Sequence, residues 1–169
     1  MKAIISVFNK DKVVEFAKAL HELGTEILAT EGTARVISGS GTPVTKVSDF
    51  TGSPAMLGGK VKTLHPCIHA GIATAEIQFV VVNLMPPDLV PRKPLESMDV
   101  GGVAMLRSGI KNFENVAVIV NPSSYNELIV ELREKGRITR ETKLRLAKEA
   151  SRHILAYDSQ IDMLLERME

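Results

Sequence analysis

Apolar residues along the chain form short continuous runs that alternate with stretches of helical spacing. The run from Ala3 to Phe8 precedes a segment in which apolar residues recur every three or four positions up to Gly24. Such a run predicts a strand, and the recurring spacing predicts a helix. The order then repeats, with a strand at Glu26 to Ala29, a short helix over 34–37 and a strand at Val44 to Val47. Strands that alternate with helices indicate a parallel sheet.

Two later runs are typical of strands that helices cover on both faces. Phe79 to Leu84 and Val116 to Val120 have the continuous Val, Ile and Leu content of such strands. A helix is predicted to begin near Asp99, another to end at Lys135, and a longer one to open at Thr139. The pattern therefore predicts about five strands wrapped by helices.

Length and composition indicate one globular domain over residues 1–169. Of the 169 residues, 44% are hydrophobic and 24% are charged, a mixture that is neither disordered nor membrane-embedded. The net charge of +1 argues against a nucleic-acid partner and favours a small molecule held by a local cluster. No run approaches the roughly 20 apolar residues of a membrane span. A cytoplasmic location is expected, with no membrane partner.

Candidate chemistry lies in the loops after the strands, since ligands of open parallel sheets bind outside the carboxyl ends of the strands. The loop from Ser6 to Lys10 follows the first strand, and Thr30, Gly32 and Thr33 follow the second. Hydroxyls and free N–H groups at a helix start favour a phosphate. The alternative is that both threonines only cap a helix.

The stretch GGKVKTLHP, from Gly58 to Pro66, is the third candidate. In an extended segment Lys60 and Lys62 project to one face, and Thr63 adds a hydroxyl beside them. Two cations together suggest an anion between them, and the glycines permit close approach to a ligand. The alternative is a solvated lysine pair on the surface.

Two further groups of polar residues have a spacing that is compatible with a binding or catalytic site. His65, Cys67 and His69 alternate as metal ligands can, but Pro66 and the tight run give poor tetrahedral geometry, so packing or hydrogen-bonding roles are favoured. Asp99-Val100-Gly101-Gly102 places an acid before N–H groups able to hold an oxyanion. Farther along, Arg107 and Lys111 share one helix face.

Together, GGKVKTLHPCIHAGI, VVVNL and DVGGVAMLRSGIKN resemble the IMP cyclohydrolase domain of the bifunctional purine-biosynthesis enzyme, without its formyltransferase domain. The resemblance implies an α/β methylglyoxal-synthase-like (Rossmann-like) three-layer fold with a mostly parallel sheet, and a homodimer. It implies closure of 5-formamidoimidazole-4-carboxamide ribotide to inosine monophosphate with loss of water, and no metal or cofactor.

The resemblance also implies roles for individual residues. Lys62 and Asp99 match residues of the reacting centre, and Lys111 matches a lysine proposed to relay protons. The residues expected to bind the purine ribotide are Ser6, Lys10, Thr30, Gly32, Thr33, Lys60, Thr63, Gly101, Gly102 and Arg107.

Three positions depart from the family pattern. Met85 in NLMPP stands where the family has tyrosine, and a thioether cannot donate a proton. Lys60 replaces a common arginine, which loses the planar fork suited to phosphate. Phe8 replaces a serine, so one hydroxyl of the pocket wall is absent. The alternative function is a catalytically weak or inactive ribotide-binding module of the same fold. Methylglyoxal synthase is a second alternative, against which KTLHP and DVGG argue.

Overall fold

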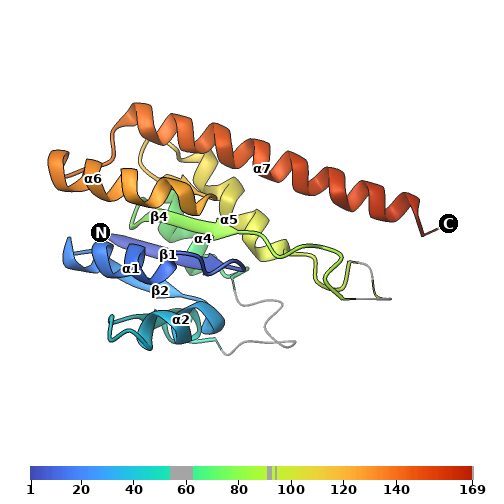
Figure 1. The fold of residues 1–169 in the computed structure, drawn as a ribbon, viewed down its shortest axis with the longest axis horizontal. Coiled ribbons are helices and arrows are strands. Elements are labelled where there is room, and N and C mark those ends of the chain that lie inside the picture. The colour runs from blue at the N-terminus through green and yellow to red at the C-terminus, as the bar shows by residue number, and fades with distance from the viewer. Residues whose placement is uncertain (54–62, 91–92, 94, 169) are drawn as a thin grey trace.

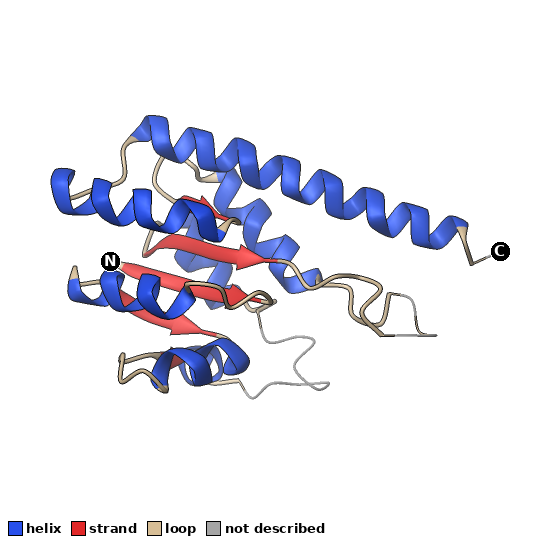
Figure 2. Cartoon of the chain, viewed as in Figure 1, coloured by secondary structure: helices blue, strands red, loops and turns tan. Residues whose placement is uncertain are grey.

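One five-stranded parallel sheet organises the chain (Figures 1 and 2). The computed structural model describes residues 1–53, 63–90, 93 and 95–168. The strands lie in the order β3-β2-β1-β4-β5. The elements along the chain are β1 (Lys2–Val7), α1 (Val13–Glu22), β2 (Glu26–Ala29), α2 (Glu31–Ser38), β3 (Thr45–Lys46), α3 (Val47–Thr51), α4 (Pro66–Ala73), β4 (Ile77–Asn83), α5 (Val100–Lys111), β5 (Ala117–Ile119), the 3-10 turn η2 (Pro122–Ser124), α6 (Tyr125–Lys135) and α7 (Arg140–Glu166).

Side chains that alternate along the strands feed two separate cores. On one face, Ile5 and Val81 pack with apolar residues of α1, α2 and α6. On the other face, Ile4 and Val80 pack with residues of α3, α4, α5 and α7. Successive residues of a strand point to opposite faces, so continuous apolar runs are needed to fill both cores. The predicted three layers and parallel sheet are confirmed.

Helix α5 lies very close to the sheet. A Cβ added at Gly109 would come within 2.7 Å of the Val118 side chain, so only glycine fits there without displacement. The long helix α7 packs beside α5 and β5 and continues past the sheet toward the C-terminus (Figure 1). Among the described helices, none combines the length and apolar content of a membrane span.

Two predicted segments differ from the structure. The strand expected at Val44 to Val47 is reduced to Thr45–Lys46, because Val47 is already the first residue of α3 and is fully buried. The alternation of His65, Cys67 and His69, which an extended segment would give, is absent because α4 begins at Pro66. Proline suits the first turn of a helix, where its missing N–H costs no hydrogen bond, and His65 provides the cap.

Candidate active site

The carboxyl ends of β1 and β4 mark the place where the strand order reverses. In the sheet, β2 lies on one side of β1, and β4 lies on the other side of β1. Loops diverge at such a point and leave a crevice for ligands. Here the two exits are joined by a pair of amide hydrogen bonds: Asn9 N donates to Asn83 Oδ1 at 2.8 Å, and Asn83 Nδ2 donates to Asn9 O at 3.0 Å.

Three hydroxyls gather on the β2 side of this point. Thr30 Oγ1 lies 3.4 Å from Ser6 Oγ and 3.5 Å from Thr33 Oγ1. The hydroxyl of Thr33 also contacts the backbone N and O of Val7, each at 3.4 Å. Thr30 occupies the N-cap position of α2 but makes no side-chain cap hydrogen bond. The reading of Thr30 as a simple capping side chain is therefore wrong, and its hydroxyl faces β1 instead.

The first turn of α2 completes this corner. Gly32 is exposed, and no atom lies within 4 Å of where its Cβ would be. Glu31 precedes it, and one of its carboxylate oxygens, Oε1, is buried without a hydrogen-bond partner among the described residues. On the β1 side, Lys10 Nζ donates to the carbonyls of Val7 and Phe8. The corner thus holds hydroxyls, a cation and an open helix start.

The start of α5 forms the second corner. Asp99 is the N-cap, and its Oδ1 accepts a hydrogen bond from Gly102 N at 2.7 Å. A Cβ at Gly102 would lie 2.7 Å from Asp99 Oδ2, and one at Gly101 would lie 2.1 Å from the hydroxyl of Thr63. The two glycines therefore let Asp99 and Thr63 approach the first turn closely. No described residue accepts a hydrogen bond from the N–H of Val100 or Gly101.

Two expected site residues lie elsewhere on α5. Arg107 pairs with Asp158 of α7, with 3.0 Å between Nη2 and Oδ2, and both side chains are largely exposed. Lys111 is the last residue of α5, which places it about 18 Å along the helix from Asp99. The structure does not bring either cation to Asp99 within one protomer. Lys60 and Lys62 lie outside the described residues.

Comparison with known families shows to which of them this fold and site belong. A model of the MGS-like domain matches residues 12–108 of the chain. The chain belongs to the MGS-like domain family. A second model, described as the AICARFT/IMPCHase bienzyme, matches residues 109–169. The five-stranded sheet is thus an α/β MGS-like fold, as the sequence indicated.

Curated relatives identify the branch of this family. The bifunctional purine biosynthesis protein PurH of Persephonella marina is 43% identical over 97% of this chain, and that of Bacillus cytotoxicus is 41% identical over 99%. The chain spans 36% and 37% of their lengths, so it is homologous to the N-terminal part of PurH, the IMP cyclohydrolase domain. A crystal structure of ForH is 35% identical, with a TM-score of 0.87 and 98% of both chains covered.

The metal-site alternative is not supported by this MGS-like domain. His65 caps α4, and its Nδ1 accepts from Cys67 N at 3.2 Å. His69 Nδ1 lies 2.8 Å from Ser108 Oγ of α5. Within the described parts of the chain, no three His, Cys, Asp or Glu side chains converge as ligands would. The histidines instead connect α4 to its neighbours.

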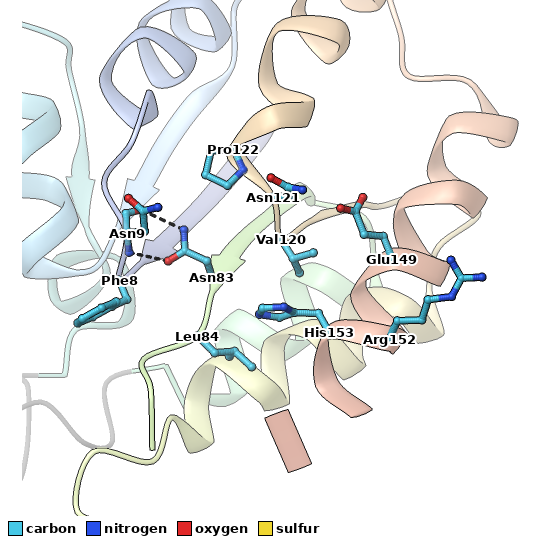
Figure 3. Close-up of a pocket in the computed structure, with 10 residues that line it drawn as sticks. All are labelled: Phe8, Asn9, Asn83, Leu84, Val120, Asn121, Pro122, Glu149, Arg152 and His153. Carbon is cyan, nitrogen blue, oxygen red and sulfur yellow. Dashed lines mark hydrogen bonds between the residues drawn. The ribbon is translucent and has the colours of Figure 1, made fainter. Parts of the chain in front are cut away.

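A pocket of about 480 Å³ extends the carboxyl edge of the MGS-like domain toward α7 (Figure 3). Leu84 and Val120 form its apolar wall, and the ring of His153 projects from α7 toward them. Nε2 of His153 is buried and has no hydrogen-bond partner in the part of the chain that the structure describes. Burial lowers the pKa of this imidazole, although Glu149 opposes the shift, so the ring is neutral near pH 7. The Arg152 side chain points away from the amide pair.

Sequence reasoning missed one buried polar group beside Asp99. Tyr157 of α7 is 5% exposed, and its hydroxyl lies 2.8 Å from both Asp99 N and Met85 O. The available signal was a tyrosine inside the apolar stripe of the last helix, because a buried phenol needs hydrogen-bond partners. The identity of those partners was not readable, since they lie 58 and 72 positions away.

Proposed function

We propose that this domain is an IMP cyclohydrolase, which closes 5-formamidoimidazole-4-carboxamide ribotide to inosine monophosphate with release of water. The observation that carries the proposal is the homology to the N-terminal part of PurH over nearly the whole chain. The position of Asp99 supports it, because Asp99 lies beside the N–H groups of Val100 and Gly101, for which no described residue is an acceptor. A purine ribotide is then the ligand, and a cytoplasmic location agrees with it.

The phosphate of the ribotide is assigned to the corner between β1 and α2. Hydroxyls of Ser6, Thr30 and Thr33 meet there, and the exposed Gly32 lies in the first turn of α2. Helix N–H groups and hydroxyls both donate to phosphate oxygens, and the helix dipole favours the negative charge. Lys10 supplies a nearby cation.

Ring closure requires removal of a proton from the carboxamide nitrogen as that nitrogen attacks the formyl carbon. We assign this proton transfer to Asp99, whose Oδ2 is not the atom bonded to Gly102 N. The new C–N bond makes the formyl oxygen an alkoxide, and the N–H groups of Val100 and Gly101 are its proposed donors. Asp99 then returns that proton to the oxygen, and the formamido nitrogen gives up its own N–H proton as the C–O bond breaks, so that the oxygen leaves as water and the ring double bond forms between this nitrogen and the formyl carbon.

Orientation is the main contribution asked of the protein. Both reacting groups belong to one molecule, and fixing such groups in a reactive geometry contributes on the order of 7–11 kcal/mol. Thr63, whose hydroxyl lies close to the first turn of α5, is assigned to the binding of the ribotide. Lys60 and Lys62 stay assigned to the ribotide and the reacting centre by resemblance alone. Arg107 and Lys111 keep their predicted roles only if a second copy brings them to the site.

A ribotide-binding module with little or no turnover is the second candidate. Met85 favours it, because it occupies the family's tyrosine position and its side chain, 37% exposed, has no acidic proton. The substitution Met85→Tyr tests this point. A faster enzyme would show that an acid is absent from the native site, whereas an unchanged rate would show that another group supplies the proton.

Conversion of the formamido ribotide to inosine monophosphate, followed by ultraviolet absorbance, tests the proposed function. The assay contains no added metal or folate, and a blank without protein measures spontaneous closure. Turnover above the blank is expected. Tight binding of inosine monophosphate with no turnover would support the module, and neither binding nor turnover would reject both functions. The predicted homodimer is tested separately by light scattering, which gives the mass in solution.

A further inference from the structure

The hydroxyl of Tyr157 links the two ends of the loop that leaves β4. It accepts a hydrogen bond from Asp99 N at 2.8 Å and donates one to Met85 O, also at 2.8 Å. Met85 is the second residue after β4, and Asp99 closes the loop by capping α5. One buried oxygen atom therefore sets the spacing between the exit of β4 and the start of α5.

Asp99 is held at two points as a result. Its backbone N–H is fixed by Tyr157, and its carboxylate is fixed by Gly102 N. Its φ of −86° and ψ of 87° are not helical, so the helix itself does not impose this conformation. Without the phenol oxygen, rotation about the Asp99 backbone would move the carboxylate relative to the N–H groups of Val100 and Gly101.

The surroundings of Tyr157 make this link rigid. The side chain belongs to the apolar core that includes Ile154 and Leu106, so the ring has little freedom. Burial raises the pKa of the phenol, and the charges of Asp99 and Asp158 act in the same direction, while the bond from Asp99 N opposes it. The hydroxyl therefore keeps its proton, and the donation to Met85 O is constant over the working pH range.

We propose that Tyr157 is a positioning residue of the ring-closure site, which holds the Asp99 carboxylate in register with the first N–H groups of α5. The proposal rests on the proposed function, because it takes Asp99 as the proton acceptor. Tyr157 itself does not touch the substrate. Its effect is exerted through the backbone of Asp99, and the residue comes from a helix that carries none of the expected site residues.

Tyr157→Phe removes one oxygen atom and leaves the ring. A displacement of about 1 Å at a reacting group costs up to roughly 100-fold in rate, so kcat is expected to fall about 10- to 100-fold while KM stays within about threefold. The matched control is Tyr125→Phe, the same change at the other tyrosine of the chain. Tyr125 is buried on the opposite face and stacks on Phe16, and its variant should keep the wild-type kcat.

Amide hydrogen exchange, measured by NMR on the free protein, separates positioning from general stability. In Tyr157→Phe, the amides of Asp99 and Gly102 should exchange about tenfold faster, while core amides of β1 and β4 stay unchanged. Loss of protection at all of these amides, or a kcat within twofold of the wild type, would overturn the proposal. If Tyr157→Phe does not fold, the exchange rate of the Asp99 amide in the wild-type protein tests the proposal instead. Exchange at the rate of an unprotected peptide would overturn the assignment.

The same experiment distinguishes failure of the inference from failure of the proposed function. If the wild-type protein does not turn over the formamido ribotide, the proposed function is rejected by that result alone. The exchange of Gly102 then reports whether Tyr157 still positions the Asp99 carboxylate. An unchanged Gly102 rate in Tyr157→Phe would overturn the positioning role as well, and a faster rate would retain it as a property of the fold.

Discussion

At the start of α5 two backbone donors have no acceptor among the described residues, whereas just after its end the side chain of Asn112 is hydrogen-bonded through both its oxygen and its nitrogen. Asp99 caps Gly102 N, but the N–H groups of Val100 and Gly101 have no acceptor among the described residues. At the other end, Asn112 Nδ2 donates to Ile72 O at 2.8 Å and to Ala73 O at 3.1 Å. Donors that remain available at a helix start can bind a ligand, while the Asn112 amide holds α4.

This difference separates residues that are needed for turnover from residues that are needed for folding. Residues at the start of α5 should affect turnover more than folding, and residues at the end should affect folding more than turnover. Arg107 and Lys111 were assigned to the site on resemblance, yet they lie toward the structural end. Measurements of turnover and stability for variants at either end of α5 can therefore contradict this contrast.

The largest effect is expected for Asp99→Asn. The amide oxygen can still accept from Gly102 N, so the cap and the stability should be nearly retained. Loss of the proton acceptor should lower kcat by about 10²- to 10⁴-fold, measured by the absorbance assay. The matched variant at the other end is Lys111→Met, which keeps the chain length and should retain kcat within about twofold. Equal losses in both variants would show that Lys111 reaches the reacting centre, which requires a second copy.

Gly101→Ala should give the next largest effect. The new methyl carbon would lie 2.1 Å from Thr63 Oγ1, so Thr63 or the helix start must move, at a cost of about 1–3 kcal/mol in unfolding free energy. The KM for the ribotide should also rise in this variant, because Thr63 and the helix start belong to the proposed binding site. The double variant Gly101→Ala/Thr63→Ala removes the clashing hydroxyl and should recover most of the stability. Gly32→Ala, where the space is open, is the control, and an equal loss there would refute the steric explanation.

Asn112→Ala should weaken the protein without weakening the enzyme. Two carbonyls at the end of α4 lose their donor, and the unfolding free energy from urea titration should fall by about 1–2 kcal/mol. Turnover should be unchanged. The control is Asn115→Ala, since Asn115 is exposed and, among the described residues, its side chain bonds only to Asn112 Oδ1. A drop in kcat for Asn112→Ala would mean that the two ends of α5 are not independent.

His153 should produce the smallest effect, as a pH dependence of stability. Burial lowers its pKa in the folded protein below the ordinary value of 6.5, so the unfolded chain binds a proton at higher pH than the folded one. Stability is then fully present above pH 6.5 and decreases as the pH falls from there through the folded pKa. Urea titrations between pH 5 and 8 should show a shallower decrease for His153→Gln. Identical profiles would show that other groups cause the acid sensitivity.

The hydrophobic pattern predicted most of the fold because the strands β1, β4 and β5 are buried on both faces. Phe79 to Leu84 and Val116 to Val120 had to be apolar throughout to fill two cores, and this is visible in the sequence. The pattern predicted no helix at Pro66 to Ala73, where the proline is the first residue of α4. It also extended the edge strand through Val47, since burial alone does not distinguish a strand from a helix start.

The candidate site divides in the same way. Asp99 and its glycines could be predicted from sequence because a cap and the turn it caps are neighbours along the chain. Thr30 could be located but not understood, since its hydroxyl contacts Ser6 of another strand rather than its own helix. Lys111 could be placed on α5, and its role stays a prediction, because it lies at the opposite end of that helix from Asp99.

The sequence by itself determined the alternation of elements, the parallel sheet, the family resemblance and the local cap at Asp99, because all of these depend on spacing along the chain. Tertiary structure decided which groups meet. It brought Tyr157 to Asp99 across 58 positions and left Lys111 at the far end of its helix. The physical reason is that a hydrogen bond needs two groups within about 3 Å of each other, and only the packing of α7 against α5 and the sheet determines which distant residues come that close.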